Sequence, residues 1–345
     1  MFTLLDRYRV NALHVRDDAA TGLKAIIAIH NTRFGPALGG CRFVHYHSTD
    51  AALEDAVRLA RGMSYKAVMA GLPQGGGKSV ILKPRGPHDR EALFREFGRF
   101  VDSLGGEYIT AIDAGTGARD MDWIGEHTPH VTSTSHEVNP SVFTARGVYE
   151  GIRAAVRHKL DRDDLEGLRI AVQGLGNVGW RLCEHLHAAG ARLIVSDIEP
   201  ERVQRAVQTL GAEAVAPEDI YAVPCVVFAP CGLGGIINPE TLKHLHCRIV
   251  AGSANNQLLS EADGVTLHKH GILYAPDYVI NAGGLIYASL NHLGHSLSEI
   301  ETKTLRIGET LLDLFEQADT CNLPPSVMAD QLAESRLYGE LSRAA

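Results

Sequence analysis

The segment with the most evident capacity for chemistry is 71–81, GLPQGGGKSVI, in which three glycines precede Lys78 and a serine. This composition is typical of a phosphate-binding loop, whose backbone N–H groups surround the phosphates of ATP or GTP. Such a loop requires a glycine six positions before the lysine, but that position is Leu72, and Gly71 comes one residue too early. A P-loop also follows a strand and opens a helix, whereas here a helical pattern precedes the glycines and a strand pattern follows them. Lys78 is therefore predicted to have another chemical role.

A second glycine motif, VQGLGNVG, fits a dinucleotide-binding turn. Gly174, Gly176 and Gly179 form a complete GxGxxG after an apolar strand and at the start of a helix, and Asp197 closes the next strand. Gly174 permits the tight turn, Gly176 lets a pyrophosphate approach the backbone, and the helix N-terminus stabilises negative charge. Asp197 can bond the ribose hydroxyls and repel a 2′-phosphate, which predicts NAD, although Arg202 nearby leaves NADP open.

Lys66, Lys78 and Asp113 are the candidates for chemistry outside the nucleotide site. A nucleotide-binding half joined to another domain predicts a dehydrogenase, and conversion of an amino acid to a 2-oxo acid needs three groups. A cation must hold the α-carboxylate, a base must deprotonate the attacking water, and an acid must move protons to and from the leaving ammonia. A free lysine, with a pKa of about 10.4, is a poor base at neutral pH. A second ammonium, an apolar cleft and glycine backbone would lower that pKa, so we predict one lysine as anchor, one as base, and Asp113 as proton relay.

Composition limits the class of protein. The chain has 345 residues, which suits two domains, and 45% apolar residues, which is typical of α/β enzymes. A formal net charge of −8 argues against nucleic acid as a partner. No apolar run approaches the roughly 20 residues that cross a bilayer, no export signal is visible, and the six cysteines form no CxxC pair. Histidine pairs spaced i, i+2 point apart on a helix, so no metal site is predicted. We expect a cytoplasmic protein without a membrane partner.

Alternating strand and helix patterns divide the chain into two predicted α/β domains. Residues 1–140 form the first. Residues 141–325 alternate apolar strands with short helices, which predicts a parallel, doubly wound Rossmann sheet that binds ligands at the carboxyl ends of its strands. The strands expected there are 168–174, 191–197, 225–230, 247–254 and 272–281. The helical tail, 326–345, could pack on either domain.

Eight segments in one order carry a resemblance to a known family. They are PALGGCRF (36–43), GMSYK (62–66), GLPQGGGKSVI (71–81), YITAIDAGT (108–116), GLGNVG (174–179), APCGLGG (229–235), AGSANNQL (251–258) and APDYVINAGG (275–284). The chain thereby resembles the leucine, phenylalanine and valine branch of the amino acid dehydrogenases, relatives of glutamate dehydrogenase, and is most like the leucine enzymes. The resemblance implies NAD-dependent oxidative deamination of an L-amino acid, in a cleft between a substrate-binding and oligomerisation domain and the Rossmann domain.

The resemblance also implies roles for individual residues. The lysine matching Lys66 grips the substrate carboxylate, the lysine matching Lys78 acts as base, and the aspartate matching Asp113 relays protons. The substrate is further contacted at positions that match Leu38, Gly39, Gly40, Ala111, Asn281, Leu285 and Ala288. The cofactor is surrounded, beyond the three glycines and Asp197, at positions that match Thr144, Asn177, Val178, Ser253, Ala254 and Asn255.

Leu38 predicts which kind of side chain the amino acid substrate carries. Glutamate-specific relatives carry a lysine in this slot, which pairs with the distal carboxylate of the substrate, so Leu38 predicts an apolar substrate. Ala111 resembles leucine enzymes, whereas Leu285 is more like some phenylalanine enzymes, and Ala288 opens space. We expect leucine and other branched aliphatic amino acids first and phenylalanine second. Ile112 replaces an acid that often precedes the aspartate in leucine enzymes, which puts the orientation of Asp113 in question.

Three other functions remain open at this point. An aromatic amino acid dehydrogenase would share the chemistry and differ in the pocket. A non-catalytic NAD or amino-acid sensor would have no need for the set of Lys66, Lys78 and Asp113. A hydroxy-acid dehydrogenase usually uses a histidine or a single lysine as base, and no His–Asp pairing is evident. The expected partners are the amino acid, the 2-oxo acid and ammonia, and the resemblance implies a homo-oligomer.

Overall fold

The chain folds into two compact units in the computed structural model, which describes residues 1–339. Unit 1 contains residues 1–139, 288–296 and the described residues from Arg336 onward. Unit 2 contains Pro140–Tyr287 and Leu297–Ser335. Each unit is built around one sheet, so the mixed α/β class predicted from the sequence is confirmed.

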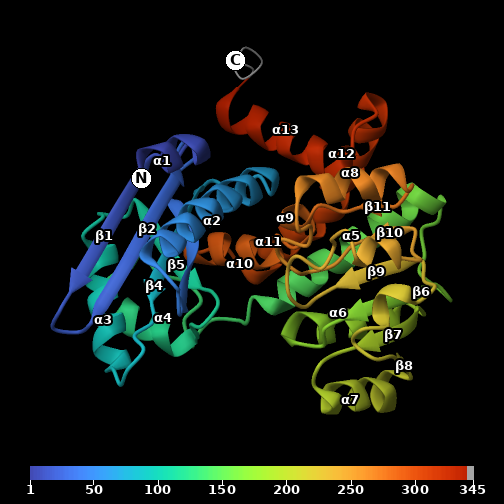
Figure 1. Ribbon diagram of the computed structural model, residues 1–345, viewed down its shortest axis with the longest axis horizontal. Helices are drawn as coiled ribbons and strands as arrows, with labels where there is room; N and C mark the ends of the chain where they lie inside the picture. The colour runs from blue at the N-terminus through green and yellow to red at the C-terminus, as the bar shows by residue number, and fades with distance from the viewer. Residues whose placement is uncertain (340–345) are drawn as a thin grey trace. The chain divides into compact units, whose positions relative to one another are not determined.

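The sheet of unit 1 is mixed. Its strands are β1 (Ala12–Asp18), β2 (Leu23–Asn31), β3 (Ala37–Val44), β4 (Gly75–Leu82) and β5 (Tyr108–Ile112). The spatial order is β1-β2-β4-β3-β5, in which β3 runs parallel to both β4 and β5, while β2 is antiparallel to β1 and β4. Figure 1 shows the long neighbouring strands β1 and β2 in blue. Residues at one level of β4, β3 and β5 therefore lie side by side.

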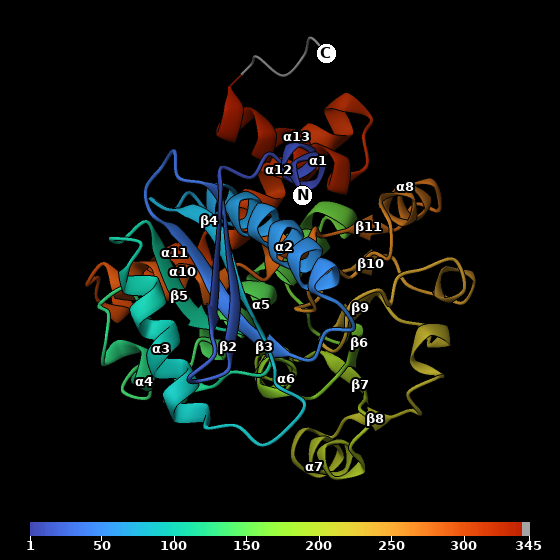
Figure 2. The ribbon, with the colours of Figure 1, turned by 60° about the vertical axis from the view of Figure 1, so that its left-hand side comes forward.

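Helices cover both faces of this sheet (Figure 2). They are α1 (Phe2–Tyr8), α2 (Thr49–Met69), α3 (Arg90–Asp102) and α4 (Ala118–Gly125). Helix α2, whose N-cap Ser48 accepts a hydrogen bond from the backbone N–H of Ala51, covers the face that includes Val80. Helices α3 and α4 cover the other face, where Ile81 packs. The adjacent residues Val80 and Ile81 of β4 thus belong to two different hydrophobic cores, because successive side chains of a strand lie on opposite faces of the sheet.

The glycines before Lys78 lie in the strand itself. Strand β4 begins at Gly75, earlier than the strand pattern of the sequence indicates, and pairs with β2 and β3 on its two sides. A Cβ at Gly76 would lie 2.0 Å from the backbone nitrogen of Ser64 in α2. A Cβ at Gly39 would lie 1.8 Å from the carbonyl oxygen of Gly77. The glycines therefore let α2 and β3 approach β4, and the backbone of this segment is occupied by sheet pairing, which excludes a P-loop.

The sheet of unit 2 is parallel throughout. Its strands are β6 (Arg169–Gln173), β7 (Arg192–Ser196), β8 (Glu213–Ala214), β9 (Val227–Pro230), β10 (Ile249–Val250) and β11 (Leu273–Tyr274). The order β11-β10-β9-β6-β7-β8 reverses direction between β6 and β9. In open α/β sheets ligands bind at such a switch point, outside the carboxyl ends of the strands. The predicted doubly wound Rossmann sheet is confirmed.

Helices complete unit 2, and two of them, α10 and α13, also contribute residues to unit 1. They are α5 (Ser141–Leu160), α6 (Asn177–Ala188), α7 (Pro200–Leu210), α8 (Glu261–Lys269), α9 (Asp277–Ile280), α10 (Gly283–His292), α11 (Leu297–Leu305), α12 (Ile307–Cys321) and α13 (Pro325–Tyr338). Short 3-10 turns lie at Ile220–Ala222 and Thr241–Lys243. Leu267 of α8 belongs to one buried cluster with Ala171, Phe228 and Val250 of three neighbouring strands.

The expected strand over 272–281 is mostly wrong. Only Leu273–Tyr274 pairs as β11, and Pro276 then caps the short helix α9. Proline has no N–H for the sheet ladder, and its φ of −56° suits the entry to a helix. The apolar run is still buried, so apolarity alone did not distinguish a strand from a helix here.

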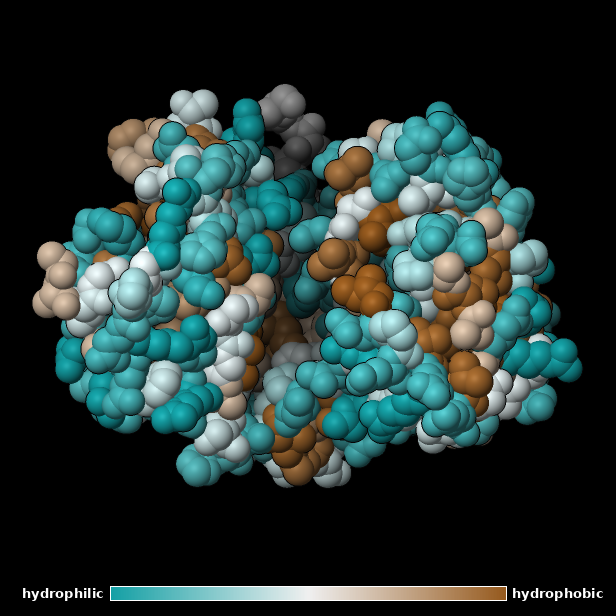
Figure 3. All heavy atoms as spheres, turned by 60° about the horizontal axis from the view of Figure 1, so that its bottom comes forward, coloured by the Kyte–Doolittle hydropathy of each residue, from teal (hydrophilic) through white to brown (hydrophobic). Residues whose placement is uncertain are grey.

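The surface is largely hydrophilic. In the face shown in Figure 3, teal and white residues cover most of each unit, and brown residues form separate patches. Within residues 1–339, no helix is both long enough and apolar enough to cross a membrane.

Candidate active site

One face of the sheet in unit 1 gathers the residues predicted to act on a substrate. Leu38 and Gly40 of β3, Lys78 of β4 and Ala111 of β5 share this face, because Leu38 pairs with Gly76 and Gly40 with Ala111 in the ladders. Lys78 pairs with Ala28, which belongs to the core under α2. The face is therefore the one that α2 covers.

Lys78 and Asp113 form a direct ion pair. Nζ of Lys78 lies 2.6 Å from Oδ2 of Asp113, with side chains 6% and 22% exposed. Asp113 immediately follows β5, and its backbone N–H donates to Oγ1 of Thr116, which fixes the turn after the strand. Burial would raise the pKa of Asp113, but the charges of Lys78 and Arg42 outweigh it and lower the pKa to about 2. Asp113 is therefore an anion at neutral pH.

Arg42 is a site residue that the sequence analysis missed. Its Nε donates to Oδ2 of Asp113 at 3.0 Å, and its Nη1 donates to Asp55 of α2 at 2.7 Å. Tyr46 also donates to Asp55 at 2.7 Å. A signal was present, because Arg42 follows Gly40 by two positions in one strand and so shares its face. The guanidinium of Arg42 thus connects the carboxylate of Asp113 to Asp55 of α2.

Gly40 allows Asp113 to sit against β3. A Cβ at Gly40 would lie 2.7 Å from Cβ of Asp113 and 2.8 Å from the carbonyl oxygen of Ile112. The side chain of Ile112 packs with the core under α3 and α4, on the opposite face from Lys78. The sequence departure at Ile112 therefore changes the core and not the surroundings of the carboxylate.

Lys66 lies on α2, the helix that covers this face. It is half-buried and follows by two residues Ser64, whose backbone contacts Gly76 of β4. Oγ of Ser64 also shares a 2.7 Å hydrogen bond with Nδ1 of the buried His30. Burial lowers the pKa of His30 to about 4, so this contact uses a neutral ring. The segment that carries Lys66 is thus tied closely to the strand that carries Lys78.

The dinucleotide turn of unit 2 has the geometry that its glycines predict. Gly174 has a φ of +95° and lies after β6, where a Cβ would be 3.0 Å from the backbone of Cys231 after β9. A Cβ at Gly179 would lie 1.9 Å from the carbonyl oxygen of Gly174, so this glycine closes the turn on its helix. A Cβ at Gly176, the N-cap of α6, would meet no described atom within 4 Å. Asn177 and Val178 open α6, and the space at its N-terminus fits a pyrophosphate.

Asp197 follows β7, and both oxygens of its carboxylate already accept hydrogen bonds from the protein backbone. Oδ2 accepts from the backbone N–H of Leu175 at 2.5 Å, and Oδ1 accepts from that of Glu199 at 2.9 Å. Nη1 of Arg202 lies 3.7 Å from Oδ2, and the aspartate side chain is only 5% exposed. The acid expected to meet the ribose therefore also holds the glycine turn in place.

Asn281 connects several of the other predicted residues. Its Nδ2 donates to the carbonyl of Ser253 at 3.1 Å and to Oδ1 of Asn255 at 2.8 Å. The adjacent Ala254 is buried and its N–H donates to the carbonyl of Pro230 at the end of β9. Across the described residues, Oδ1 of Asn281 is buried and finds no hydrogen-bond donor. That oxygen is an acceptor that a bound molecule could use.

The remaining predicted residues lie on α10 or beside its first turn. A Cβ at Gly284 would lie 2.8 Å from Oγ1 of Thr144 in the first turn of α5, so this turn packs closely on α10. Leu285 and Ala288 are both buried. Leu285 belongs to unit 2, whereas Ala288 belongs to unit 1, where the next residue, Ser289, donates a hydrogen bond to Gln74.

A parallel Rossmann unit with a complete dinucleotide turn, joined to an α/β unit that buries a lysine–aspartate pair, defines a nucleotide-dependent dehydrogenase. Comparison with known proteins agrees. Residues 8–130 match the family described as Glu/Leu/Phe/Val dehydrogenase, dimerisation domain, and residues 140–201 and 194–305 match Glutamate/Leucine/Phenylalanine/Valine dehydrogenase. The chain belongs to this Glu/Leu/Phe/Val dehydrogenase family.

Individual relatives cover nearly the whole chain. Leucine dehydrogenase of Geobacillus stearothermophilus is 49% identical over 98% of this chain and 93% of its own length. Phenylalanine dehydrogenase of Caldalkalibacillus thermarum is 43% identical over 93% of this chain and 89% of its own. The crystal structure of L-tryptophan dehydrogenase from Nostoc punctiforme has a TM-score of 0.87 and 41% identity, and the match covers 98% of each chain.

Proposed function

We propose that this protein catalyses the reversible oxidative deamination of an apolar L-amino acid to its 2-oxo acid and ammonia, with NAD as oxidant and leucine and other branched-chain amino acids preferred. The observation that carries the proposal is the buried ion pair of Lys78 and Asp113 on the face that holds Leu38. The chain is an amino acid dehydrogenase by family. This makes a non-catalytic sensor or a hydroxy-acid dehydrogenase a poor description of it.

The chemistry assigns one task to each charged residue. Lys66 binds the α-carboxylate as a cation. Lys78 accepts a proton from the water that attacks the iminium carbon, and the C–O bond forms as that proton leaves. Asp113, at 2.6 Å from Lys78, carries protons to and from the substrate nitrogen, which departs as ammonia when the C–N bond breaks. Oδ1 of Asn281 accepts a hydrogen bond from the substrate's amino group.

Whether Lys78 can accept a proton depends on the charged groups beside it. The sequence predicts a second ammonium beside Lys78, whereas the structure places the carboxylate of Asp113 there, and a carboxylate stabilises an ammonium. Lys78 can act as base only after the pair changes its contacts. We propose that the substrate ammonium competes for Asp113 and thereby frees Lys78.

The cofactor assignment depends on unit 2. The positive φ of Gly174, the open space at Gly176 and the N-terminus of α6 fit the pyrophosphate of a dinucleotide. Asp197 favours NAD, and Thr144, Ser253 and the backbone near Asn255 are proposed to line the nicotinamide end. When bound, NAD accepts the hydride from the substrate α-carbon.

The substrate preference depends on a small number of apolar side chains. Leu38 is 1% exposed on the face of Lys78, and a distal carboxylate placed there would lack a cation, so glutamate is disfavoured. Ala111, Leu285 and Ala288 are buried as well. Discrimination by one or two methylenes is only about 1–3 kcal/mol. An aromatic substrate is the second candidate, because relatives named for phenylalanine and tryptophan are 43–44% identical to this chain.

Initial rates of NADH formation with leucine, valine, isoleucine, phenylalanine, tryptophan and glutamate test the proposal directly. We expect kcat/KM to be highest for a branched aliphatic amino acid and lowest for glutamate. The highest value with phenylalanine or tryptophan would move the assignment to the aromatic class. No NADH from any of them, despite NAD binding, would contradict a catalytic role.

Two lysine variants test the assigned roles. Lys78→Ala should keep NAD binding and lose about 10²–10⁴-fold in kcat, whereas Lys66→Ala should mainly raise KM for the amino acid. The matched control is Lys24→Ala, which removes an exposed lysine of β2 that pairs with Asp17. Near-normal kcat in Lys78→Ala would show that another group is the base.

The proposed function is accompanied by a proposed oligomeric state and a proposed cellular location. We propose a homo-oligomer, because residues 8–130 match a dimerisation domain. We propose a cytoplasmic location, because the cysteines among residues 1–339 are all free thiols. Sedimentation of the purified chain tests the first proposal, and fractionation of its native cells tests the second.

A further inference from the structure

The guanidinium of Arg42 lies between two carboxylates of unit 1, and the roles proposed for the two lysines and for Asp113 do not account for it. Its Nε donates to Oδ2 of Asp113 at 3.0 Å, and its Nη1 donates to Oδ2 of Asp55 at 2.7 Å. The side chain of Arg42 is 23% exposed, and both carboxylates are more than three-quarters buried. An arginine whose planar fork binds two partly buried carboxylates is held in one orientation.

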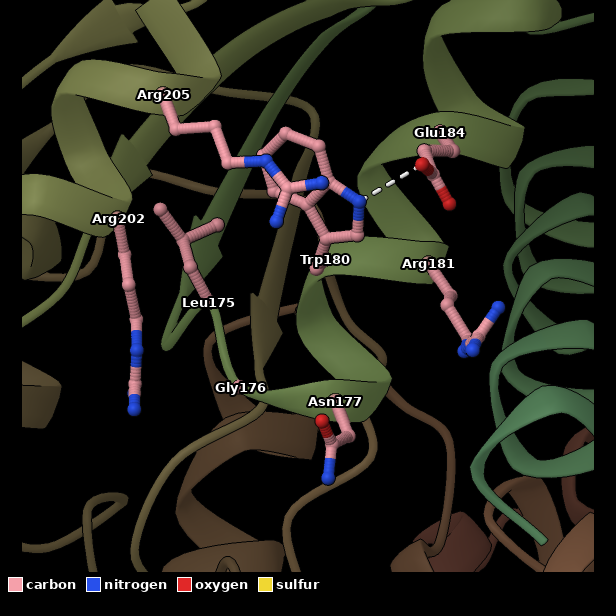
Figure 4. A pocket seen from close by; sticks show the side chains of 8 residues that line it. All are labelled: Leu175, Gly176, Asn177, Trp180, Arg181, Glu184, Arg202 and Arg205. Carbon is pink, nitrogen blue, oxygen red and sulfur yellow. Dashed lines mark hydrogen bonds between the residues drawn. The ribbon is translucent and has the colours of Figure 1, made fainter. Parts of the chain in front are cut away.

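The arginines beside the glycine turn of unit 2 have a different setting. They line a pocket of about 560 Å³ together with Trp180, whose Nε1 donates to Glu184 at 2.7 Å (Figure 4). Gly176 lines the same pocket, which therefore belongs to the cofactor site already described. The side chain of Arg202 in that pocket is 53% exposed, so it is far less enclosed than that of Arg42.

Asp55 of α2 fixes one end of the Arg42 guanidinium. Its Oδ2 also accepts from the hydroxyl of Tyr46 at 2.7 Å, and its Oδ1 accepts from Nη2 of Arg58 at 3.0 Å. Burial would raise the pKa of Asp55, but these hydrogen bonds and the charge of Arg42 outweigh it and lower that pKa. Asp55 is therefore an anion at neutral pH, and it anchors Arg42 to the helix that covers the site.

Arg42 and Lys78 contact the same oxygen of Asp113. Nζ of Lys78 lies 2.6 Å from Oδ2, and Nε of Arg42 lies 3.0 Å from it. The two cationic nitrogens can be no farther apart than the sum of these distances, which is close enough for each charge to affect the ionisation of the other group. Across residues 1–339, Oδ1 of Asp113 accepts no side-chain hydrogen bond. This second oxygen is therefore available to the nitrogen of a substrate.

We propose that Arg42 is a positioning residue of this dehydrogenase, which holds Oδ2 of Asp113 throughout the reaction and disfavours a proton on Lys78. The inference rests on the proposed function, in which the substrate ammonium competes for Asp113 and frees Lys78. When the contact with Lys78 breaks, Arg42 stays on Oδ2, so Asp113 keeps its charge and presents Oδ1 to the substrate. The freed lysine then lies near a cation instead of bonding a carboxylate, so it gives its proton to water and becomes the base.

The groups around Asp113 set how this proposal depends on pH. The charged ones are Lys78 of β4, Arg42 of β3, and Asp55, Arg58 and Lys66 of the covering helix α2. The thiol of Cys41 also lies near Asp113, but burial raises its pKa to about 12, so it stays neutral. Of these groups, Lys78 and Asp113 are the two whose protonation state the reaction uses.

The pH profile of kcat with leucine and NAD tests the charge of Arg42. Loss of a cation favours a proton on its neighbours, so Arg42→Gln should move the acidic limb of the profile to higher pH by about one unit. Arg42→Lys keeps the charge but cannot bridge two carboxylates, so its limb should stay near that of the unaltered chain while kcat falls. The matched control, Arg99→Gln, removes an arginine that pairs with Glu96 on α3, over the other face of the sheet.

A double-mutant cycle in unfolding free energy tests the contact without turnover. Asp113→Asn should destabilise the Arg42→Gln chain less than the unaltered chain, because the partner of the carboxylate is already absent. If Arg42→Gln impairs folding, Asp55→Asn serves instead. It frees the guanidinium from α2 and should lower kcat about tenfold, while KM for leucine stays nearly unchanged.

The outcomes separate this proposal from the proposed function. Additive losses in the cycle, or an acidic limb that Arg42→Gln leaves in place, would overturn the role of Arg42. The same would hold if Arg42→Gln changed only KM for leucine. If the unaltered chain oxidised none of the amino acids of the panel, the proposed function would fail, while the cycle would still decide whether Arg42 holds Asp113.

Discussion

Nζ of Lys78 in β4 and Oδ2 of Asp113, directly after β5, lie 2.6 Å apart, although β4 and β5 do not pair with each other. Strand β3 lies between β4 and β5, and Gly40 at this level has no side chain to separate them. The lysine side chain therefore reaches over β3 to the carboxylate. The ion pair of Lys78 and Asp113 therefore depends on the missing side chain at Gly40 as well as on the two charges.

Gly40→Ala should displace Asp113 and slow the reaction. The added methyl would lie 2.7 Å from Cβ of Asp113 and 2.8 Å from the carbonyl oxygen of Ile112, and a backbone oxygen cannot move freely. A displacement of about 1 Å in a catalytic group can cost about 100-fold in rate. We expect kcat to fall by that order. The control is Gly86→Ala, at a position where a Cβ meets no described atom within 4 Å. Unchanged kcat in Gly40→Ala, with the fold intact by circular dichroism, would show that this close approach is not needed.

The carboxylate of Asp113 should also stabilise the fold in a pH-dependent way. Burial opposes ionisation, but Lys78 and Arg42 lower its pKa from 3.8 to about 2. A folded-state pKa below the unfolded value gives stability that is fully present above pH 3.8 and is lost as the pH falls toward 2. The shift corresponds to roughly 2 kcal/mol.

Chemical unfolding of the unaltered chain and Asp113→Asn measures this contribution. The difference in unfolding free energy between the two should shrink by roughly half between pH 6 and pH 3. Asp313→Asn is the control, because Asp313 is exposed on α12 and forms no ion pair within residues 1–339. A difference for Asp113→Asn that stays constant over this range would mean that the ion pair does not set the titration.

The sequence predicted the parts of the fold that depend on local pattern. The parallel sheet of unit 2 follows from apolar strands that alternate with short helices, and the turn at Gly174 follows from glycine spacing. The sequence did not predict that a strand begins at Gly75, because glycine is disfavoured in strands. The glycines of this strand are explained by the close approach of α2 and β3, which only the structure shows. The apolar residues near Pro276 were likewise ambiguous until burial was known.

The candidate site was predictable where a residue has a distinctive neighbour in sequence. Lys78 follows three glycines and Asp113 follows an apolar strand, and these local patterns mark both residues as candidates in the sequence. The strand alternation that places Arg42 on the face of Gly40 was readable in the sequence, but its contact with Asp55 of another element was not, because only tertiary structure brings the two within 2.7 Å.

Gly176 and Gly179 should respond differently to alanine, although both belong to one motif. A Cβ at Gly179 would lie 1.9 Å from the carbonyl oxygen of Gly174, so Gly179→Ala must distort the turn and lower the melting temperature. A Cβ at Gly176 meets no described atom within 4 Å, and its φ of −67° suits alanine. Gly176→Ala should therefore leave the melting temperature nearly unchanged, while its methyl occupies the space proposed for the pyrophosphate.

We expect Gly176→Ala to weaken NAD binding at least tenfold, which is about 1.4 kcal/mol, as measured by calorimetry on the protein without substrate. The contrast between the two variants is informative because the same methyl group is added in each. If Gly176→Ala bound NAD normally, the pyrophosphate could not approach the backbone at this residue, and the assigned function of the turn would be wrong. If instead Gly176→Ala unfolded as readily as Gly179→Ala, the glycine would serve the fold and not the ligand.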